Sequence, residues 1–303
     1  MKAESVCRIC SGATEAAGSK WGRFRQQEFH LRRCPRCSYA FVADPWTDYA
    51  AIYSEAYYAG NGADPLVDYQ YELEQPDRTV RFYEWRGIAT AVASLASVGA
   101  ETCWLDFGCG NGGLVRYCRN RFGCRVIGFE QGAIVEAAAR YGVPIVTQAE
   151  LDRLAGSCDV VTAIEVLEHA EDPIGTLRQI RRLLRPGGLF FYTTGNAAPY
   201  RSRLTKWRYV TPEIHISYFE PEALRLALTA AGFQPEFRGW LPGFTDIMRF
   251  KILKYLRQRR RSWMEYAAPW PLLARLAELQ VKLFEHPVAF AREDFRESST
   301  ESC

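Results

Sequence analysis

The chain has 303 residues, of which 48% are hydrophobic, enough to bury a sizeable core in one large domain or in a domain with satellites. Its formal net charge of +3 is close to balance, so composition singles out neither nucleic acid nor a membrane as a partner. The N-terminal stretch MKAESVCRIC lacks the apolar segment of a signal peptide, and no apolar run reaches the roughly 18–20 residues of a membrane span. These features predict a cytoplasmic protein.

Residues 1–43 are polar and punctuated by cysteine, with alternating stretches that suit small β-hairpins. Two CxxC pairs, Cys7 with Cys10 and Cys34 with Cys37, indicate a metal site rather than disulfides in a chain without an export signal. Two such turns supply four thiolates, which complete a tetrahedral zinc site and leave no position for a reacting water. The pattern predicts a structural zinc-ribbon module; two unrelated reduced pairs are the alternative.

Residues 44–78 are rich in tyrosine, aspartate and glycine without clear periodicity, which predicts an aromatic linker or lid. Residues 79–240 alternate helical and strand patterns, and the strands include TCWLDFG, CRVIGFE, CDVVTAI and GLFFYTT. Fully apolar strands that alternate with helices predict a doubly wound, mostly parallel α/β sheet covered on both faces. Residues 241–303 are predicted to form a helical C-terminal extension, with a basic cluster, RQRRR, at 257–261.

The first of these strands runs into a glycine-rich turn, LDFGCGNGG at 105–113, where a ligand can approach bare main chain. Gly108 and Gly110 belong to a GxGxxG pattern, which taken alone is a weak signal for a dinucleotide. Asp106 stands beside these glycines, and a carboxylate there would repel a bound pyrophosphate. The second strand ends in Glu130, which can accept hydrogen bonds from ribose hydroxyls. Two acids at adjacent strand ends favour a cationic sulfonium nucleoside, S-adenosylmethionine, over NAD.

At these motifs the sequence resembles the class I S-adenosylmethionine-dependent methyltransferases over roughly residues 79–240. The resemblance implies that Gly108 and Gly110 line the methionine part of the cofactor, that Asp106 acts near its amino group and that Glu130 holds the ribose. It also implies that residues from Gln148 to Glu150 face the adenine. The family's closing strand is not legible in 241–303, which leaves the edge of the sheet open.

The stretch EVLEHAEDP places Glu165, Glu168 and His169 just past the fourth strand, beside the expected position of the transferred methyl. We assign Glu165 to the cofactor site and His169 as general base or acceptor contact, because an imidazole titrates near neutrality; a role in bracing the next helix is the alternative. The spacing also resembles the ubiquinone-pathway O-methyltransferases, in which this segment is associated with a divalent ion, but no second metal is expected here. The segment with Tyr209, His215 and Tyr218 is predicted to shape an acceptor pocket or, alternatively, to pack under the following helix.

Together these motifs predict a methyltransferase that acts on a small molecule or a glycan precursor, with structural zinc. An N-terminal cysteine ribbon followed by a YYxG-like segment resembles methyltransferases that tailor sugars, polyketides and surface polysaccharides. The sugar C-methyltransferases of that group are longer, so C-methylation is not carried over. The alternatives are an rRNA methyltransferase with a zinc module, although nucleic acid is not the expected partner, and a non-catalytic zinc-ribbon scaffold. The basic and amphipathic stretch at 250–285 suggests peripheral contact with an anionic membrane.

Overall fold

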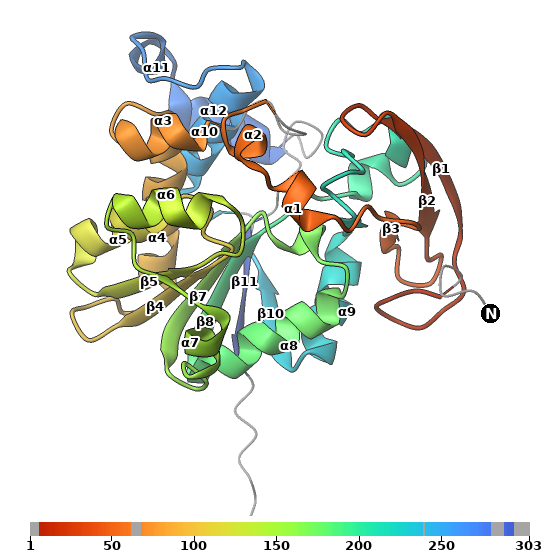
Figure 1. The fold of residues 1–303 in the computed structure, drawn as a ribbon, viewed down its shortest axis with the longest axis horizontal. Coiled ribbons are helices and arrows are strands. Elements are labelled where there is room, and N and C mark those ends of the chain that lie inside the picture. The colour runs from red at the N-terminus through yellow and green to blue at the C-terminus, as the bar shows by residue number, and fades with distance from the viewer. Residues whose placement is uncertain (1–5, 62–67, 239, 280–287, 294–303) are drawn as a thin grey trace, which may run out of the picture.

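The computed structural model of the chain describes residues 6–61, 68–238, 240–279 and 288–293, and their arrangement is shown in Figure 1. In this part of the chain, one sheet has seven strands and a second, smaller sheet has four. The smaller sheet lies at the side of the molecule opposite α5 and α6 (Figure 1). The prediction of a Rossmann-like α/β fold is confirmed by the large sheet.

The large sheet is parallel over its central strands and antiparallel at one edge. Across the sheet the strands run in the order β10 (Phe233–Phe237), β11 (Val288–Glu293), β8 (Leu184–Thr193), β7 (Cys158–Ile164), β4 (Cys103–Phe107), β5 (Arg125–Phe129) and β6 (Ile145–Val146). The chain order reverses beside β4, which is the point where ligands bind in doubly wound sheets. The sequence analysis missed β11, which pairs with both β10 and β8 within the region predicted to be helical.

Helices cover both faces of this sheet, as buried strands on both sides require. One face packs against α7 (Gln148–Asp152), α8 (Pro173–Leu183) and α9 (Pro221–Ala230). The other packs against α4 (Arg81–Leu95), α5 (Gly113–Phe122), α6 (Ile134–Arg140) and α10 (Phe244–Tyr255). The alternation is visible within β4, where Leu105 and Phe107 belong to the first core and Trp104 to the second.

Local sequence signals set several helix boundaries. Asp172 caps α8 by accepting a hydrogen bond from the Gly175 N–H, and Pro173 occupies its first turn. A capping box between Thr147 and Glu150 starts α7. These signals agree with the predicted alternation of strands and helices.

The N-terminal region forms the smaller sheet together with a short strand from the large domain. Its strands are β1 (Glu15–Gly22), β2 (Gln27–Arg33), β3 (Ala40–Val42) and β9 (Ser217–Tyr218), in that order. The antiparallel pairing of Ala40 with Tyr218 and of Phe41 with Ser217 joins the cysteine-containing region to the segment that follows β8. The small hairpins predicted for residues 1–43 are confirmed.

The predicted aromatic linker contains three short helices, α1 (Tyr49–Ile52), α2 (Glu55–Tyr58) and α3 (Tyr69–Glu74), and α2 and α3 lie on the same side of the molecule as α10 and α12 (Figure 1). In the C-terminal region, α10 is followed by α11 (Met264–Ala267) and α12 (Trp270–Leu279). Helix α10 crosses α4 closely at Gly243 and Gly87. A Cβ added at Gly243 would lie only 2.1 Å from the Gly87 carbonyl oxygen, so the close approach requires glycine there. Among the described residues, the helices are too short or too polar for any of them to traverse a bilayer.

Candidate active site

The glycine-rich loop folds as bare main chain against the neighbouring strand. Gly108, Gly110 and Gly112 have φ angles of +73°, +54° and +71°, a left-handed region in which side chains are disfavoured. The N–H groups of Gly108 and Cys109 donate to the Phe129 carbonyl at 2.8 and 3.0 Å, which ties the loop to the end of β5. The predicted cofactor loop therefore lies at the carboxyl ends of β4 and β5.

The two predicted acids flank this loop. Asp106 is buried and accepts a hydrogen bond of 2.7 Å from the Thr162 hydroxyl. Burial raises the pKa of Asp106 to about 7, although the hydrogen bond from Thr162 opposes the shift. Glu130 accepts hydrogen bonds from the N–H groups of Gly110 at 3.0 Å and Gly132 at 2.9 Å. The structure thus brings Asp106, Gly110 and Glu130 together, as the sequence analysis expected.

The segment after β7 forms the second half of the site. Glu165 has a φ of +56°, a strained value for a residue with a side chain, and a single 3-10 turn, Leu167–His169, follows it. The Glu168 side chain is fully buried and accepts hydrogen bonds from the hydroxyls of Thr194, at 2.8 Å, and Tyr209. Burial and the charge of Glu165 raise the pKa of Glu168 to about 8. Two carboxyl groups therefore share a buried region.

The surroundings of His169 determine its tautomer. Its Nδ1 lies 2.8 Å from the Ile214 carbonyl oxygen and 3.0 Å from the Tyr53 hydroxyl. Because a carbonyl oxygen only accepts, Nδ1 carries the proton of the neutral ring, and Nε2 has the lone pair. The Nδ1 of His215 lies 2.7 Å from the Tyr209 carbonyl oxygen, so the same reasoning assigns its proton to Nδ1. Each imidazole can therefore act as a base through Nε2.

His215 joins Glu168 and His169 in one cluster, in which one ligand atom from each residue lies within 4.8 Å of the others. A carboxylate with two neutral imidazoles is a donor set that suits several divalent transition metals. The ring of His215 lies 5.0 Å from that of His169 and 4.1 Å from that of Tyr209. Tyr218, by contrast, is buried in the core of the smaller sheet. Tyr209 and His215 thus lie at the site, whereas Tyr218 packs beneath it.

A network of buried charges links the C-terminal helix α10 to this site. The ammonium of Lys251 on α10 lies 3.4 Å from Glu165 and 3.4 Å from Glu84 on α4. Burial lowers the pKa of Lys251, but the carboxylates of Glu165 and Glu84 more than offset this effect and raise it. The sequence analysis missed Lys251, because its contact depends on how α10 packs against α4.

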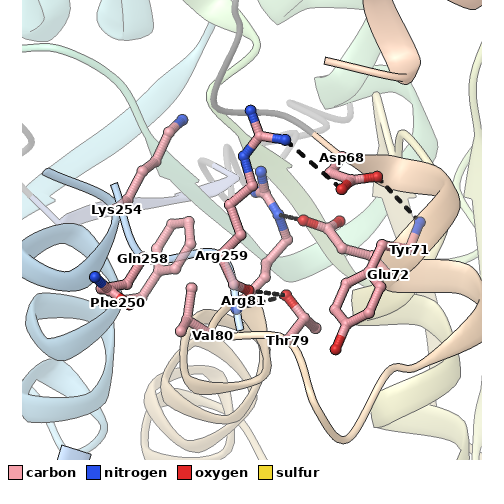
Figure 2. Close-up of a pocket in the computed structure, with 10 residues that line it drawn as sticks. All are labelled: Asp68, Tyr71, Glu72, Thr79, Val80, Arg81, Phe250, Lys254, Gln258 and Arg259. Atoms are coloured by element: carbon pink, nitrogen blue, oxygen red, sulfur yellow. Dashed lines mark hydrogen bonds and ion pairs between the residues drawn. The ribbon is translucent and has the colours of Figure 1, made fainter. Parts of the chain in front are cut away.

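The network continues toward the glycine-rich loop through Arg81. Its guanidinium lies 2.9 Å from Glu84 and 2.8 Å from Glu72, and Glu72 accepts a hydrogen bond of 2.7 Å from Asn111 in the loop. Figure 2 shows Arg81 and Glu72 at the wall of a pocket beside Phe250 of α10, with Asp68 and Arg259 paired above them. We call the residues from Glu165 through Lys251, Glu84 and Arg81 to Glu72 the ion-pair network.

The four predicted cysteine ligands come together in the N-terminal region. The Sγ atoms of Cys7 and Cys37 lie 3.5 Å apart, those of Cys10 and Cys34 lie 3.4 Å apart, and all four lie within 4.8 Å of one another. The two CxxC turns have the same backbone design, since the residues that follow them, Ser11 and Ser38, have φ angles of +57° and +62°. Tetrahedral zinc with Zn–S bonds of about 2.3 Å needs sulfur atoms just under about 4 Å apart. The cluster therefore suits zinc.

Other residues of the site depart from, or add to, the sequence analysis. Gln148, predicted to face the adenine, is exposed in the first turn of α7 and donates to Asp152 at 2.9 Å. Tyr53, Tyr58 and Tyr69 were not predicted individually, although the tyrosine-rich composition of residues 44–78 indicated an aromatic cover. Tyr69 lies against the loop, because a Cβ added at Gly110 would be 3.3 Å from its ring.

Comparison with known proteins agrees with this geometry. A family model described as a methyltransferase domain matches residues 78–236, more than half of the chain. Two relatives are ubiquinone biosynthesis O-methyltransferases. The protein from Pseudomonas aeruginosa is 36% identical over 105 residues, covering 31% of this chain and 45% of the relative. The protein from Xanthomonas oryzae pv. oryzae is 37% identical over 117 residues, covering 35% and 48%. The chain thus spans less than half the length of these relatives.

Among solved structures, phosphoethanolamine N-methyltransferase 2 of Haemonchus contortus is similar in fold, with a TM-score of 0.51. It is 16% identical in sequence, and the similarity covers 84% of this chain and 62% of that one. That protein was solved with phosphomonomethylethanolamine and S-adenosylhomocysteine. The chain belongs to the methyltransferase domain family and has the Rossmann-like fold of its S-adenosylmethionine-dependent members.

Proposed function

We propose that this protein transfers a methyl group from S-adenosylmethionine to a hydroxyl group of a small molecule or glycan precursor. The observation that carries the proposal is the pair of carboxylates, Asp106 and Glu130, at the ends of adjacent strands around a loop of positive-φ glycines. Negative charge at bare main chain favours a cationic ligand and disfavours a pyrophosphate. Family membership and the names of the relatives support the same reaction.

The residues at this loop fit the cofactor. The Glu130 carboxylate is held at the loop by the main-chain N–H groups of Gly110, Gln131 and Gly132. Within the described part of the chain, its Oε2 accepts only the bond from Gly110, so this oxygen has a further lone pair for a ribose hydroxyl. Asp106 would balance the positive charge of the amino group, which favours its ionised form. Gly108 and Gly110 would line the methionine part, Glu165 would lie beside the methyl group, and Gln148 would need to turn from Asp152 to reach the adenine. When bound, the cofactor supplies an electrophilic methyl group with a good leaving group.

The protein's own contribution is then to orient an acceptor and to remove its proton. Through Nε2, His169 can take the proton of an acceptor hydroxyl, because the Ile214 carbonyl holds the other proton at Nδ1. An imidazolium at His169 would in turn favour the ionised form of the buried Glu168, and the two opposite charges would then stabilise each other away from water. The cluster with His215 could instead hold a divalent ion, which would lower the pKa of a bound hydroxyl. The relatives' names, O-methyltransferases, support oxygen as the acceptor atom.

The domain assignment follows from these roles. In our proposal, residues 1–43 form a zinc-stabilised module, 44–78 a cover, 79–240 the methyltransferase domain and 241–303 an extension that braces it. The zinc module would shape the acceptor side, because Tyr39 contacts Ser217 at 2.6 Å and Ser217 donates to the Ala170 carbonyl, next to His169. Arg8 donates to the Glu171 carbonyl in the same segment. Bound zinc would therefore have a structural role near the acceptor.

A peripheral contact with an anionic membrane is the second element of the proposal. Between Asp246 and Glu265 the chain has seven lysines and arginines and no acidic residue, and Arg257 and Arg260 among them are exposed. Large apolar side chains are exposed in the same region: Tyr255, Leu256, Trp263, Tyr266 and Leu272. Exposed aromatic residues among basic ones suit the interface of an anionic bilayer. The predicted membrane-contacting stretch, 250–285, extends beyond the described residues at positions 280–285.

Calorimetric titration with S-adenosylmethionine tests the proposed function. The wild-type protein should bind it, and Glu130→Gln should weaken binding roughly ten- to hundred-fold by removing charge-assisted hydrogen bonds to the ribose. Glu136→Gln, the same change at an exposed site on α6, should leave affinity unchanged. Binding of NAD without binding of S-adenosylmethionine would contradict the proposal. A screen of phenols, catechols and sugar nucleotides for release of S-adenosylhomocysteine would then identify the acceptor class.

A further inference from the structure

A continuous run of tyrosines connects the glycine-rich loop to His169. The ring centroids of Tyr53 and Tyr57 lie 5.2 Å apart, those of Tyr57 and Tyr58 lie 5.2 Å apart, and those of Tyr58 and Tyr69 lie 5.5 Å apart. We call these four residues the tyrosine run. They come from α1, α2 and α3 and the turns between them, outside the region that the family model matches.

The two ends of the tyrosine run touch the two halves of the site. At one end, Tyr69 packs against Gly110, and Tyr58 lies so close to Gly132 that a Cβ added there would be 1.7 Å from its hydroxyl oxygen. At the other end, the Tyr53 hydroxyl lies 3.0 Å from Nδ1 of His169. The run therefore spans the distance between the proposed ribose-binding acid and the proposed base.

Two acidic groups of the site act on Tyr53. Burial raises the pKa of Tyr53, and the carboxylates of Glu130 and Glu168 raise it further, so both act on this phenol. A nucleoside held by Glu130 whose methyl group reaches toward His169 must place its sulfur along this path. The sulfur would therefore lie near the tyrosine rings and near the carboxylates of Glu130 and Glu168.

The composition of the covering segment suits a positive charge. Residues 49–71 contain six tyrosines and neither phenylalanine nor tryptophan, and residues 44–77 contain eight acidic residues and no lysine or arginine. The face of an aromatic ring attracts a cation, with a strength that increases when water is excluded. Two of these acids, Glu72 and Asp68, already pair with Arg81 and Arg259. Plain packing of the rings, however, does not require them to contact both halves of the site.

We propose that Tyr53, supported by Tyr58 and Tyr69, recognises the charged sulfonium of S-adenosylmethionine and so distinguishes it from the neutral thioether of S-adenosylhomocysteine. This inference rests on the proposed function and adds a specificity-determining residue to it. Methyl transfer removes the positive charge from the sulfur, so the attraction to the ring is lost in the product. The tyrosine run thereby favours binding of the methyl donor and release of the product.

Titration of both nucleosides against ring-removing and ring-keeping variants tests the proposal. Tyr53→Leu should weaken binding of S-adenosylmethionine by roughly three- to thirty-fold while binding of S-adenosylhomocysteine changes by less than about twofold. Tyr53→Phe keeps the ring and should keep the wild-type ratio of the two affinities. Tyr49→Leu, which removes an exposed ring from α1, the helix that ends just before Tyr53, serves as the matched control. Tyr69→Leu provides a second test if Tyr53→Leu does not fold.

The outcomes separate this inference from the function on which it rests. If both nucleosides lose affinity equally in Tyr53→Leu and in Tyr69→Leu, the rings only pack and the inference is wrong. The proposed function stands in that case, because the wild-type protein still binds both compounds. If the wild-type protein binds neither, the proposed function itself fails. A selective loss for the charged nucleoside supports both.

Discussion

The ion-pair network gives a sharp prediction at Lys251. In the wild type the Lys251 ammonium lies 3.4 Å from the carboxylate of Glu165 and 3.4 Å from that of Glu84. Changing Lys251 to Met removes this positive charge but keeps a side chain of similar length. The side chains of Lys251, Glu165 and Glu84 are 14%, 24% and 3% exposed respectively, so water replaces the lost partner poorly. Breaking a buried pair by removing one partner costs about 3–5 kcal/mol.

The expected cost here is somewhat smaller. Glu84 keeps Arg81 at 2.9 Å, so the loss falls mainly on Glu165, which is also the more exposed of the two carboxylates. We therefore expect Lys251→Met to lower the free energy of unfolding by about 2–4 kcal/mol. Lys251→Arg, which keeps the charge, should lose less than half of that amount.

Urea unfolding followed by circular dichroism measures the change. Lys206→Met serves as the control, because it makes the same substitution at an exposed lysine in the turn Leu204–Lys206. The control should change the free energy of unfolding by less than about 0.5 kcal/mol. Equal effects of the two substitutions, or a loss below about 0.5 kcal/mol for Lys251→Met, would show that the ion pairs of Lys251 do not stabilise the fold.

Three further predictions concern the cofactor, the zinc module and the membrane. Because burial raises the pKa of Asp106 to about 7 and a cation favours its ionised form, affinity for S-adenosylmethionine should rise with pH by about tenfold per unit below pH 6 and level off above pH 7. Asp106→Asn should remove most of this dependence in calorimetric titrations, and an unchanged slope would refute the assignment. Metal analysis should find one zinc per chain. Cys34→Ser or a chelator should lower the melting temperature, and adding zinc to the chelated wild type should restore it. An unchanged melting temperature after complete removal of zinc would contradict a structural role. Trp263→Ser with Tyr266→Ser should reduce co-flotation with phosphatidylglycerol vesicles, whereas equal flotation of wild type and variant would locate the contact elsewhere.

Local sequence patterns were sufficient to predict most of the methyltransferase domain. Pro173 in the first turn of α8 and the left-handed Gly142 just after α6 mark helix ends through rules that act within a few residues, and apolar runs identified the buried strands. The strand–glycine–helix order placed Asp106 and Glu130 at one edge of the sheet, because parallel strands bring their carboxyl ends together. The CxxC spacing predicted the four-cysteine cluster, because two cysteines three positions apart in one turn can bind the same metal ion.

The residues that the sequence analysis missed depend on long-range packing. Lys251 reaches Glu165 because Gly87 and Gly243 let α10 approach α4 closely, and no pattern within either helix indicates this contact. Tyr53 contacts His169 from more than a hundred positions away in sequence. Strand β11 was missed because its short apolar stretch follows a long helical pattern, and its partners are far away in the chain. The contact of Gln148 with Asp152 shows the converse, since a local hydrogen bond competes with the expected ligand contact.

The position of β11 affects how the protein is made. Strands β8 and β10 are synthesised well before it, yet they are joined only through it in the finished sheet. A nascent chain therefore carries β8 with an unpaired edge while the ribosome translates α10 to α12, a period in which that edge is open to other chains. Completion of the sheet awaits the arrival of Val288–Glu293. Ribosome stalling or proteolysis before this segment should yield aggregation-prone fragments rather than a slightly shortened enzyme.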